Sequence, residues 1–140
     1  MTGNGKIGPA TIVPALRYRD AATAIEWLCA AFGFERHLVV PGEDGGIAHA
    51  QLTFGNGMIM LGSGQGGAYD GLVTDPASAG AVTQAPYIIV EDVDGHYAAA
   101  KAAGAEIVID IADQDYGGRL YVCRDPEGHV WNFGSYDPWA

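Results

Sequence analysis

The chain has 140 residues, 49% of them hydrophobic and 17% charged, and 17 acidic against 7 basic side chains give a net charge of −10. This composition is typical of one globular domain rather than a disordered chain. The scarcity of Lys and Arg argues against a nucleic-acid partner, because phosphate neutralisation needs clustered cations. No apolar run is long enough to span a bilayer, so we expect no membrane partner.

Neither the amino terminus nor the cysteines indicate export. Residues 1–11, MTGNGKIGPAT, lack the charged and apolar regions of a signal peptide. Cys29 falls in a predicted helix and Cys123 in a predicted strand, and two such residues make neither a disulfide framework nor a metal motif. We therefore expect a reduced, cytoplasmic protein.

The predicted elements begin with an extended run over residues 13–18. Asp20 follows as a helix N-cap, because its carboxylate can accept hydrogen bonds from first-turn N–H groups. Apolar residues then recur at helical spacing until Gly33 ends the helix. Strands are predicted next, over residues 35–40, 47–54 and 58–61.

The segment of residues 63–84 is rich in Gly, Ser and Ala and shows no clear periodicity. A connection of this length is usually functional or disordered. Two interpretations stay open: a linker, or a flap over a binding cleft with Tyr69 or Leu72 touching a ligand.

The order of elements then repeats. Asp92 is the next N-cap and Gly104 the next helix stop, and Asp125-Pro126-Glu127-Gly128 fits a type I turn. The strands predicted in this half cover residues 106–111, 119–124 and 129–133.

A shift of 72 residues superimposes the two halves of the sequence. Val13–Asp20 falls on Ala85–Asp92, and Gly46–Gly62 falls on Gly118–Gly134, with glycines matching at both ends. We therefore predict an α+β fold in a single domain, residues 1–140, built from two tandem βαβββ modules over residues 12–62 and 85–136.

These features together resemble the vicinal oxygen chelate superfamily, which includes glyoxalase I, bleomycin-resistance proteins and extradiol dioxygenases. The stretches GIAHAQLTFGNGMIMLG (46–62) and YGGRLYVCRDPEGHVWNFGSYDP (116–138) are most similar to PhnB-like and other glyoxalase-family members. The resemblance implies that the strands curl into a half-open, barrel-like cleft with the helices outside. It also implies a homodimer.

The metal enzymes of that family place ligands at four symmetric positions, which correspond here to Val13, Met60, Ala85 and Asn132. Val and Ala carry no donor atom, Met offers a thioether and Asn a neutral oxygen, where such enzymes need imidazole and carboxylate. Asn132 stands where a metal-binding Glu would stand. We therefore expect no metal and no cofactor.

The four histidines show no metal-binding spacing. We expect His37 at a strand surface, His96 half-exposed on a helix, and His129 hydrogen-bonded to the backbone of the preceding turn. His49 alternates with polar neighbours on one strand face, and is either an ordinary sheet-surface residue or a cleft-facing acid/base group.

Arg17 is the most informative candidate, because a guanidinium on an apolar strand face needs an anionic partner. That partner is either an acid of the same chain or a carboxylate or phosphonate of a ligand. The alternation of side chains predicts an apolar cleft with few polar groups. The expected ligand-binding residues are Arg17, His49, Gln51, Met58, Met60, Tyr87, Tyr116, Arg119, Tyr121 and Asn132.

Three binding or catalytic functions remain open, beside a purely structural or interaction role. The first is a metal-free protein that sequesters a planar or amphipathic small molecule, for which an acidic chain favours cationic compounds. The second is a metal-dependent lyase or isomerase of the glyoxalase type, which the replaced ligands oppose. The third is a metal-free enzyme using His49 or Tyr87 as acid or base.

Overall fold

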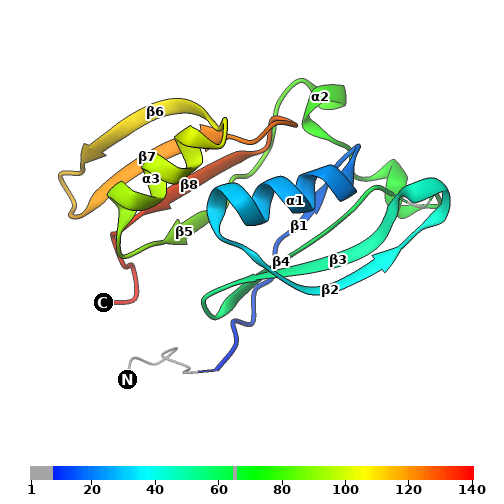
Figure 1. Cartoon of the computed structure of the whole chain (residues 1–140), viewed down its shortest axis with the longest axis horizontal. Helices are drawn as coiled ribbons and strands as arrows, with labels where there is room; N and C mark the ends of the chain where they lie inside the picture. The colour runs from blue at the N-terminus through cyan, green and yellow to red at the C-terminus, as the bar shows by residue number, and fades with distance from the viewer. Residues whose placement is uncertain (1–7, 65) are drawn as a thin grey trace.

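A computed structural model describes residues 8–64 and 66–140 of the chain (Figure 1). The first module comprises β1 (Ala15–Arg17), α1 (Ala21–Phe32), β2 (Glu35–Pro41), β3 (Ile47–Phe54) and β4 (Gly57–Gly62), with the 3-10 turn η1 (Glu43–Gly45). The second comprises β5 (Tyr87–Ile89), α3 (Val93–Ala102), β6 (Glu106–Asp113), β7 (Arg119–Arg124) and β8 (Val130–Gly134). Between them lie η2 (Tyr69–Gly71) and α2 (Pro76–Ala79).

Each module forms its own four-stranded sheet, in the orders β1-β4-β3-β2 and β5-β8-β7-β6. The parallel pairs repeat at the predicted spacing, since Ala15 lies opposite Met60 and Tyr87 opposite Asn132. The sheets stay open instead of closing into a barrel. The predicted α+β fold of two βαβββ modules with an open cleft is confirmed.

The two long helices begin where aspartate side chains accept from free N–H groups, and they end where a backbone N–H bonds a free carbonyl. Asp20 accepts from the Thr23 N–H and Asp92 from the Gly95 N–H, as predicted for N-caps. Gly33 closes α1 in the left-handed conformation with φ 87°, which glycine adopts without a steric penalty. No helix in the described part of the chain is long and apolar enough to cross a membrane.

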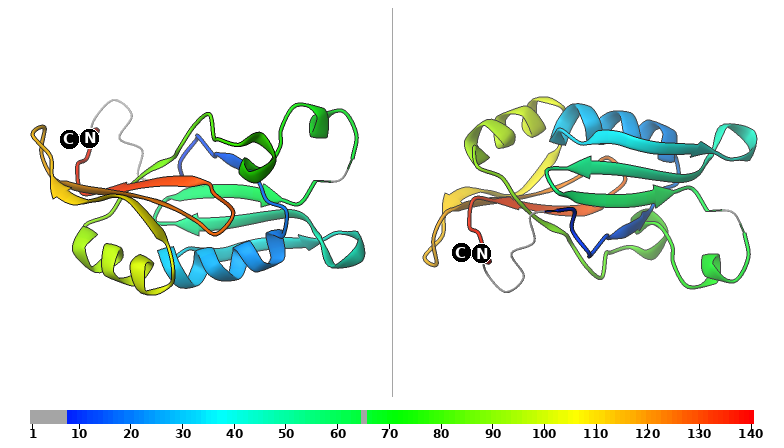
Figure 2. Two further views of the ribbon diagram at one scale, coloured as in Figure 1. Left: turned by 90° about the horizontal axis from the view of Figure 1, so that it is seen from above. Right: turned by 90° about the horizontal axis from the view of Figure 1, so that it is seen from below.

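The core lies between the helices and the sheets. Both α1 and α3 cover the same side of the two sheets, and residues 66–84, here named the connector, lie on the opposite side (Figure 2). The rings of Phe32, Trp131 and Phe133 contact one another across the two modules, with centroids 4.7–6.4 Å apart, and each is at most 1% exposed. One hydrophobic core therefore joins both modules.

A polar junction reinforces this core. Asp125, in the turn before β8, is 5% exposed and accepts hydrogen bonds from Tyr18 Oη at 2.5 Å and Trp131 Nε1 at 3.1 Å. Its other oxygen accepts from the backbone N–H groups of Glu127 and His129. The predicted turn is present, with the Gly128 N–H bonded to the Asp125 carbonyl. Beyond reversing the chain, this turn binds the second module to the end of β1.

Candidate functional site

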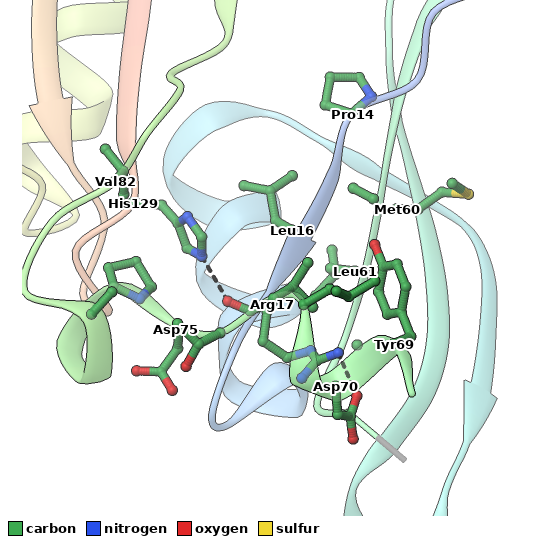
Figure 3. A pocket seen from close by; sticks show the side chains of 18 of the residues that line it. Pro14, Leu16, Arg17, Met60, Leu61, Tyr69, Asp70, Asp75, Val82 and His129 are labelled. Atoms are coloured by element: carbon green, nitrogen blue, oxygen red, sulfur yellow. Dashed lines mark hydrogen bonds and ion pairs between the residues drawn. The ribbon is translucent and has the colours of Figure 1, made fainter. Parts of the chain in front are cut away.

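A cavity of about 620 Å³ lies between the first sheet and the connector. Its floor comes from β1 and β4, and η2 and α2 lie along its side (Figure 3). Most of the lining side chains are apolar: Pro14, Ala15, Leu16, Met60, Leu61, Leu72, Val73, Pro76, Ala79 and Val82. Tyr69 and Leu72, which would touch a ligand if this segment were a flap, both line this cavity.

An ion pair closes one end of the cavity. Arg17 Nη2 lies 2.7 Å from Asp70 Oδ1, and the two side chains are 16% and 27% exposed. Figure 3 shows the Arg17 side chain reaching from β1 toward Asp70 in η2. Of the two partners left open for Arg17, an acid of the same chain is the one present. Two residues on, Arg19 pairs with Asp75 at 3.1 Å, so the end of β1 holds the connector at two points.

Two further predicted residues, His49 and Met60, line the cavity. His49 Nε2 lies 3.0 Å from Gln51 Nε2. The two polar side chains of β3 therefore hydrogen-bond each other. Gln51 pairs with Met60 across the strands, and Met58 lies on the same sheet face, but neither Gln51 nor Met58 lines the cavity.

The candidates of the second module lie elsewhere. Tyr87 Oη donates to the Tyr136 carbonyl at 2.6 Å, and the Tyr116 ring packs edge-on against Tyr136 with centroids 5.1 Å apart. Burial, with smaller contributions from Tyr116 and Asp137, raises the pKa of Tyr87. Because its pKa is raised, the Tyr87 phenol stays protonated at neutral pH and cannot accept a proton as a base.

Arg119 also lies outside the cavity, since it pairs with Asp94 and Asp113 of its own module at 3.2 and 3.0 Å. Asn132 directs its amide to the Pro86 carbonyl at 3.3 Å. The predicted site residues thus form one group around the cavity and another on the second sheet.

The expectation that Tyr121 lines the cleft is wrong for this chain. Its side chain is fully buried in the core, and its hydroxyl lies 2.6 Å from His96 Nδ1. The cause is a difference in register, because Ala50 pairs with Leu61 in the first sheet, whereas Val122 pairs with Asn132 in the second. A 72-residue shift would pair Val122 with Phe133 instead. Tyr121 is the residue equivalent to His49, and because of this offset of one residue its side chain faces the core.

Of the other three histidines, only His129 also lines the cavity. His37 is exposed, as predicted. We expected the His129 ring to bond the backbone of the preceding turn. Instead, its Nε2 donates to the Arg17 carbonyl at 2.7 Å. His96 is half-buried as expected, and donates from Nε2 to the Phe32 carbonyl at 2.8 Å. Burial lowers the pKa of His96, with an opposing contribution from that hydrogen bond.

The residues at the family's metal positions do not fit a metal centre. Val13 and Ala85 have no ligating side-chain atom, and the Asn132 amide nitrogen is turned toward backbone carbonyls. Met60 offers only a thioether, a soft and weak ligand for the ions that glyoxalases use. Within residues 8–64 and 66–140, no three His, Cys, Asp or Glu side chains lie close enough to hold a metal ion.

Sequence reasoning missed Asp70, Asp75 and the apolar connector residues as parts of one site. The connector has no periodicity, so nothing in its sequence indicated which side chains face inward. One available signal was the need of Arg17 for an acid. Asp75 also had a cap signature, since it precedes Pro76 and accepts from the Ser78 N–H of α2.

Two βαβββ modules with an open cleft define an α+β protein of the paired-module class. Comparison with known proteins identifies its family. The model of the Glyoxalase/Bleomycin resistance protein/Dioxygenase superfamily matches residues 8–133. An uncharacterised protein of Mycobacterium tuberculosis (strain H37Rv) is 36% identical over 122 residues, which are 87% of this chain and 72% of the relative. The chain belongs to the glyoxalase/bleomycin resistance protein/dioxygenase superfamily.

Solved structures show the same fold. The crystal structure of TioX from Micromonospora sp. ML1 is 36% identical with a TM-score of 0.72, and the match covers 89% of this chain and 97% of TioX. The bleomycin resistance determinant encoded on transposon Tn5 is 19% identical with a TM-score of 0.64, covering 91% and 98%. Lactoylglutathione lyase from Agrobacterium tumefaciens is 22% identical with a TM-score of 0.61, covering 92% and 95%. The last two similarities concern the fold alone.

Proposed function

We propose that the chain is a metal-free small-molecule-binding protein that sequesters a planar or amphipathic compound in the cavity beneath the connector. The observation that supports this is the cavity itself, with about 620 Å³ lined by apolar side chains in slight majority and by polar and charged ones. Binding sites for small organic molecules have this size and this lining.

The shape of the ligand follows from the walls. Pro14 and Pro76 line the cavity with rigid rings, and Met60 has a flexible side chain that can adapt to irregular ligands. Tyr69 adds an aromatic ring at the edge of the cavity and is 59% exposed. An extended, flat compound buries its apolar area on such surfaces and keeps a polar end near Arg17.

The catalytic alternatives find less support. A glyoxalase-type lyase needs imidazole and carboxylate ligands that Val13, Met60, Ala85 and Asn132 do not provide. Of the two acid/base candidates, Tyr87 hydrogen-bonds the Tyr136 carbonyl and does not line the cavity, and His49 lines it without an acid/base partner among the predicted residues.

The test is a fluorescence titration with N-phenyl-1-naphthylamine, a neutral planar dye that brightens in apolar sites. The variant Ala15→Trp fills the cavity from β1, and the control Ala98→Trp places the same ring on an exposed position of α3. The proposal expects saturable binding by the wild type and by Ala98→Trp, and at least about tenfold weaker binding by Ala15→Trp. Equal binding by all three proteins contradicts the proposed site.

A second test concerns the metal. Calorimetric titration with Ni²⁺, Zn²⁺, Co²⁺ and Mn²⁺ is expected to show no stoichiometric binding, because the donor set is incomplete. One tightly bound ion per chain, lost in Met60→Leu or Asn132→Leu, would contradict the metal-free proposal and favour the glyoxalase-type lyase.

We also propose that the chain forms a homodimer and works in the cytoplasm. The outer strands of both sheets carry large exposed apolar side chains, such as Leu38 at 44% and Ile109 at 55%, and a second copy would cover them. Light scattering after gel filtration is expected to give twice the chain mass, and Ile109→Glu to shift it toward the monomer. Cys29 and Cys123 are both free thiols, which agrees with a reducing compartment.

A further inference from the structure

We infer that the sequestered compound carries an anionic group, a carboxylate or sulfonate, which replaces Asp70 on the guanidinium of Arg17. This inference rests on the proposed function and narrows the class of ligand. Arg17 is the only Lys or Arg among the described residues that line the cavity.

Arg17 belongs to a fixed part of the fold. It lies in β1, opposite Gly62 of β4, and its carbonyl accepts the hydrogen bond from His129. Its side chain is only 16% exposed, so most of the surrounding water is excluded. A guanidinium in such a place requires an anion, since an unpaired and largely desolvated charge is costly. The guanidinium in the cavity wall therefore has to be paired with an anion, which is Asp70 in this structure.

The present partner comes from outside the sheet. Asp70 lies in η2 of the connector and also accepts from the Gly66 N–H. The connector departs from the sheet through glycines with positive φ, at Gly64, Gly66 and Gly67, where the backbone adopts conformations open to few other residues. Asp70 is already 27% exposed, so its carboxylate regains water readily when it leaves Arg17. An incoming anion then makes the same charge-assisted hydrogen bonds in its place.

The neighbouring acid is less suited to exchange. Asp75 pairs with Arg19 and at the same time accepts from the Ser78 N–H and hydroxyl at the start of α2. Displacing Asp75 would break an ion pair and the cap of a helix together, whereas displacing Asp70 breaks its pair with Arg17 and a hydrogen bond within the connector but no helix cap.

The net charge of −10 opposes any anion, but mostly from a distance. Salt screens exposed charges beyond about 10 Å at 0.1 M ionic strength, and a partly buried contact is screened much less. The local guanidinium therefore decides the sign of the charge bound at this end of the cavity.

Two dyes with the same rings test the inference. 1-Anilinonaphthalene-8-sulfonate carries a sulfonate that N-phenyl-1-naphthylamine lacks. In Arg17→Gln we expect the sulfonate dye to bind about tenfold more weakly and the neutral dye to change by less than about twofold. The control Arg36→Gln, which removes an exposed pair with Glu26 on the first module, is expected to change neither.

The complementary variant is Asp70→Asn, which removes the competing carboxylate. It is expected to bind the sulfonate dye about fivefold more tightly than wild type, and the neutral dye equally well. Weaker sulfonate binding in Asp70→Asn, or equal losses for both dyes in Arg17→Gln, overturns the inference while leaving a functioning apolar cavity. If the wild type binds neither dye, the proposed function fails and the inference fails with it.

Discussion

Replacing Asp125 by Asn tests how the two modules are held together. The substitution keeps the shape and one oxygen, which can still accept from the backbone N–H groups of Glu127 and His129. The new amide nitrogen then faces Trp131 Nε1, and two donors cannot bond each other. Tyr18 Oη can turn to accept, but its bond to a charged carboxylate is lost.

The magnitude follows from burial. Trp131 and Tyr18 are at most 1% exposed, so water cannot replace the lost acceptor. One buried donor without a partner costs about 1–3 kcal/mol, and losing the charge on another hydrogen bond adds about 1 kcal/mol. We therefore expect Asp125→Asn to lower the free energy of unfolding by about 2–4 kcal/mol. Domains of this kind are stable by only about 5–15 kcal/mol, so this is a large fraction of the total.

Urea denaturation followed by tryptophan fluorescence measures this loss. The control is Glu106→Gln, which breaks an exposed pair with Arg124 and is expected to cost less than about 0.5 kcal/mol. If Asp125→Asn costs no more than this control, the buried carboxylate is not the junction described here, and the two modules are held by the hydrophobic core alone.

Two further predictions concern His96 and Gly118. Burial lowers the pKa of His96 from 6.5, so the unfolded chain binds more protons than the folded one as the pH falls below 6.5, and stability present above that pH is lost on acidification. Urea midpoints at pH 7.5 and 5.5 should therefore differ more for wild type than for His96→Gln, and equal differences would contradict the assignment. Gly118→Ala should destabilise more than Gly45→Ala, because both have positive φ (73° and 77°) but only at Gly118 would a Cβ meet backbone, 2.7 Å from the Tyr136 nitrogen. We expect a difference of at least about 1 kcal/mol, measured by thermal unfolding, and equal melting temperatures would argue against this close approach.

Most of the fold was predictable because it is encoded in local and repeated signals. Asp20 and Asp92 cap their helices, and Met60 and Asn132 occupy equivalent positions 72 residues apart. These features depend on a few neighbouring residues or on strict alternation, both of which are visible in the sequence. The order of the strands and of the two long helices, with their N-caps, therefore followed without a structure.

The candidate site was only partly predictable. The need of Arg17 for an acid was clear, but its partner Asp70 lies 53 residues away in a segment without periodicity. Tyr121 was misplaced because a one-residue change of register cannot be read from spacing alone. The role of Asp125 was hidden by its turn signature, which explains the residue locally and gives no reason to look for Tyr18.

The central claim is that a planar compound binds between β1, β4 and the connector, and amide NMR maps this most directly. The measurement is a titration of ¹⁵N-labelled protein with N-phenyl-1-naphthylamine. The largest saturable shifts are expected on cavity residues such as Leu16, Gly62, Leu72 and Ala79. Shifts centred instead on Tyr87, Tyr116 and Tyr136 would place the site on the second sheet and contradict the account.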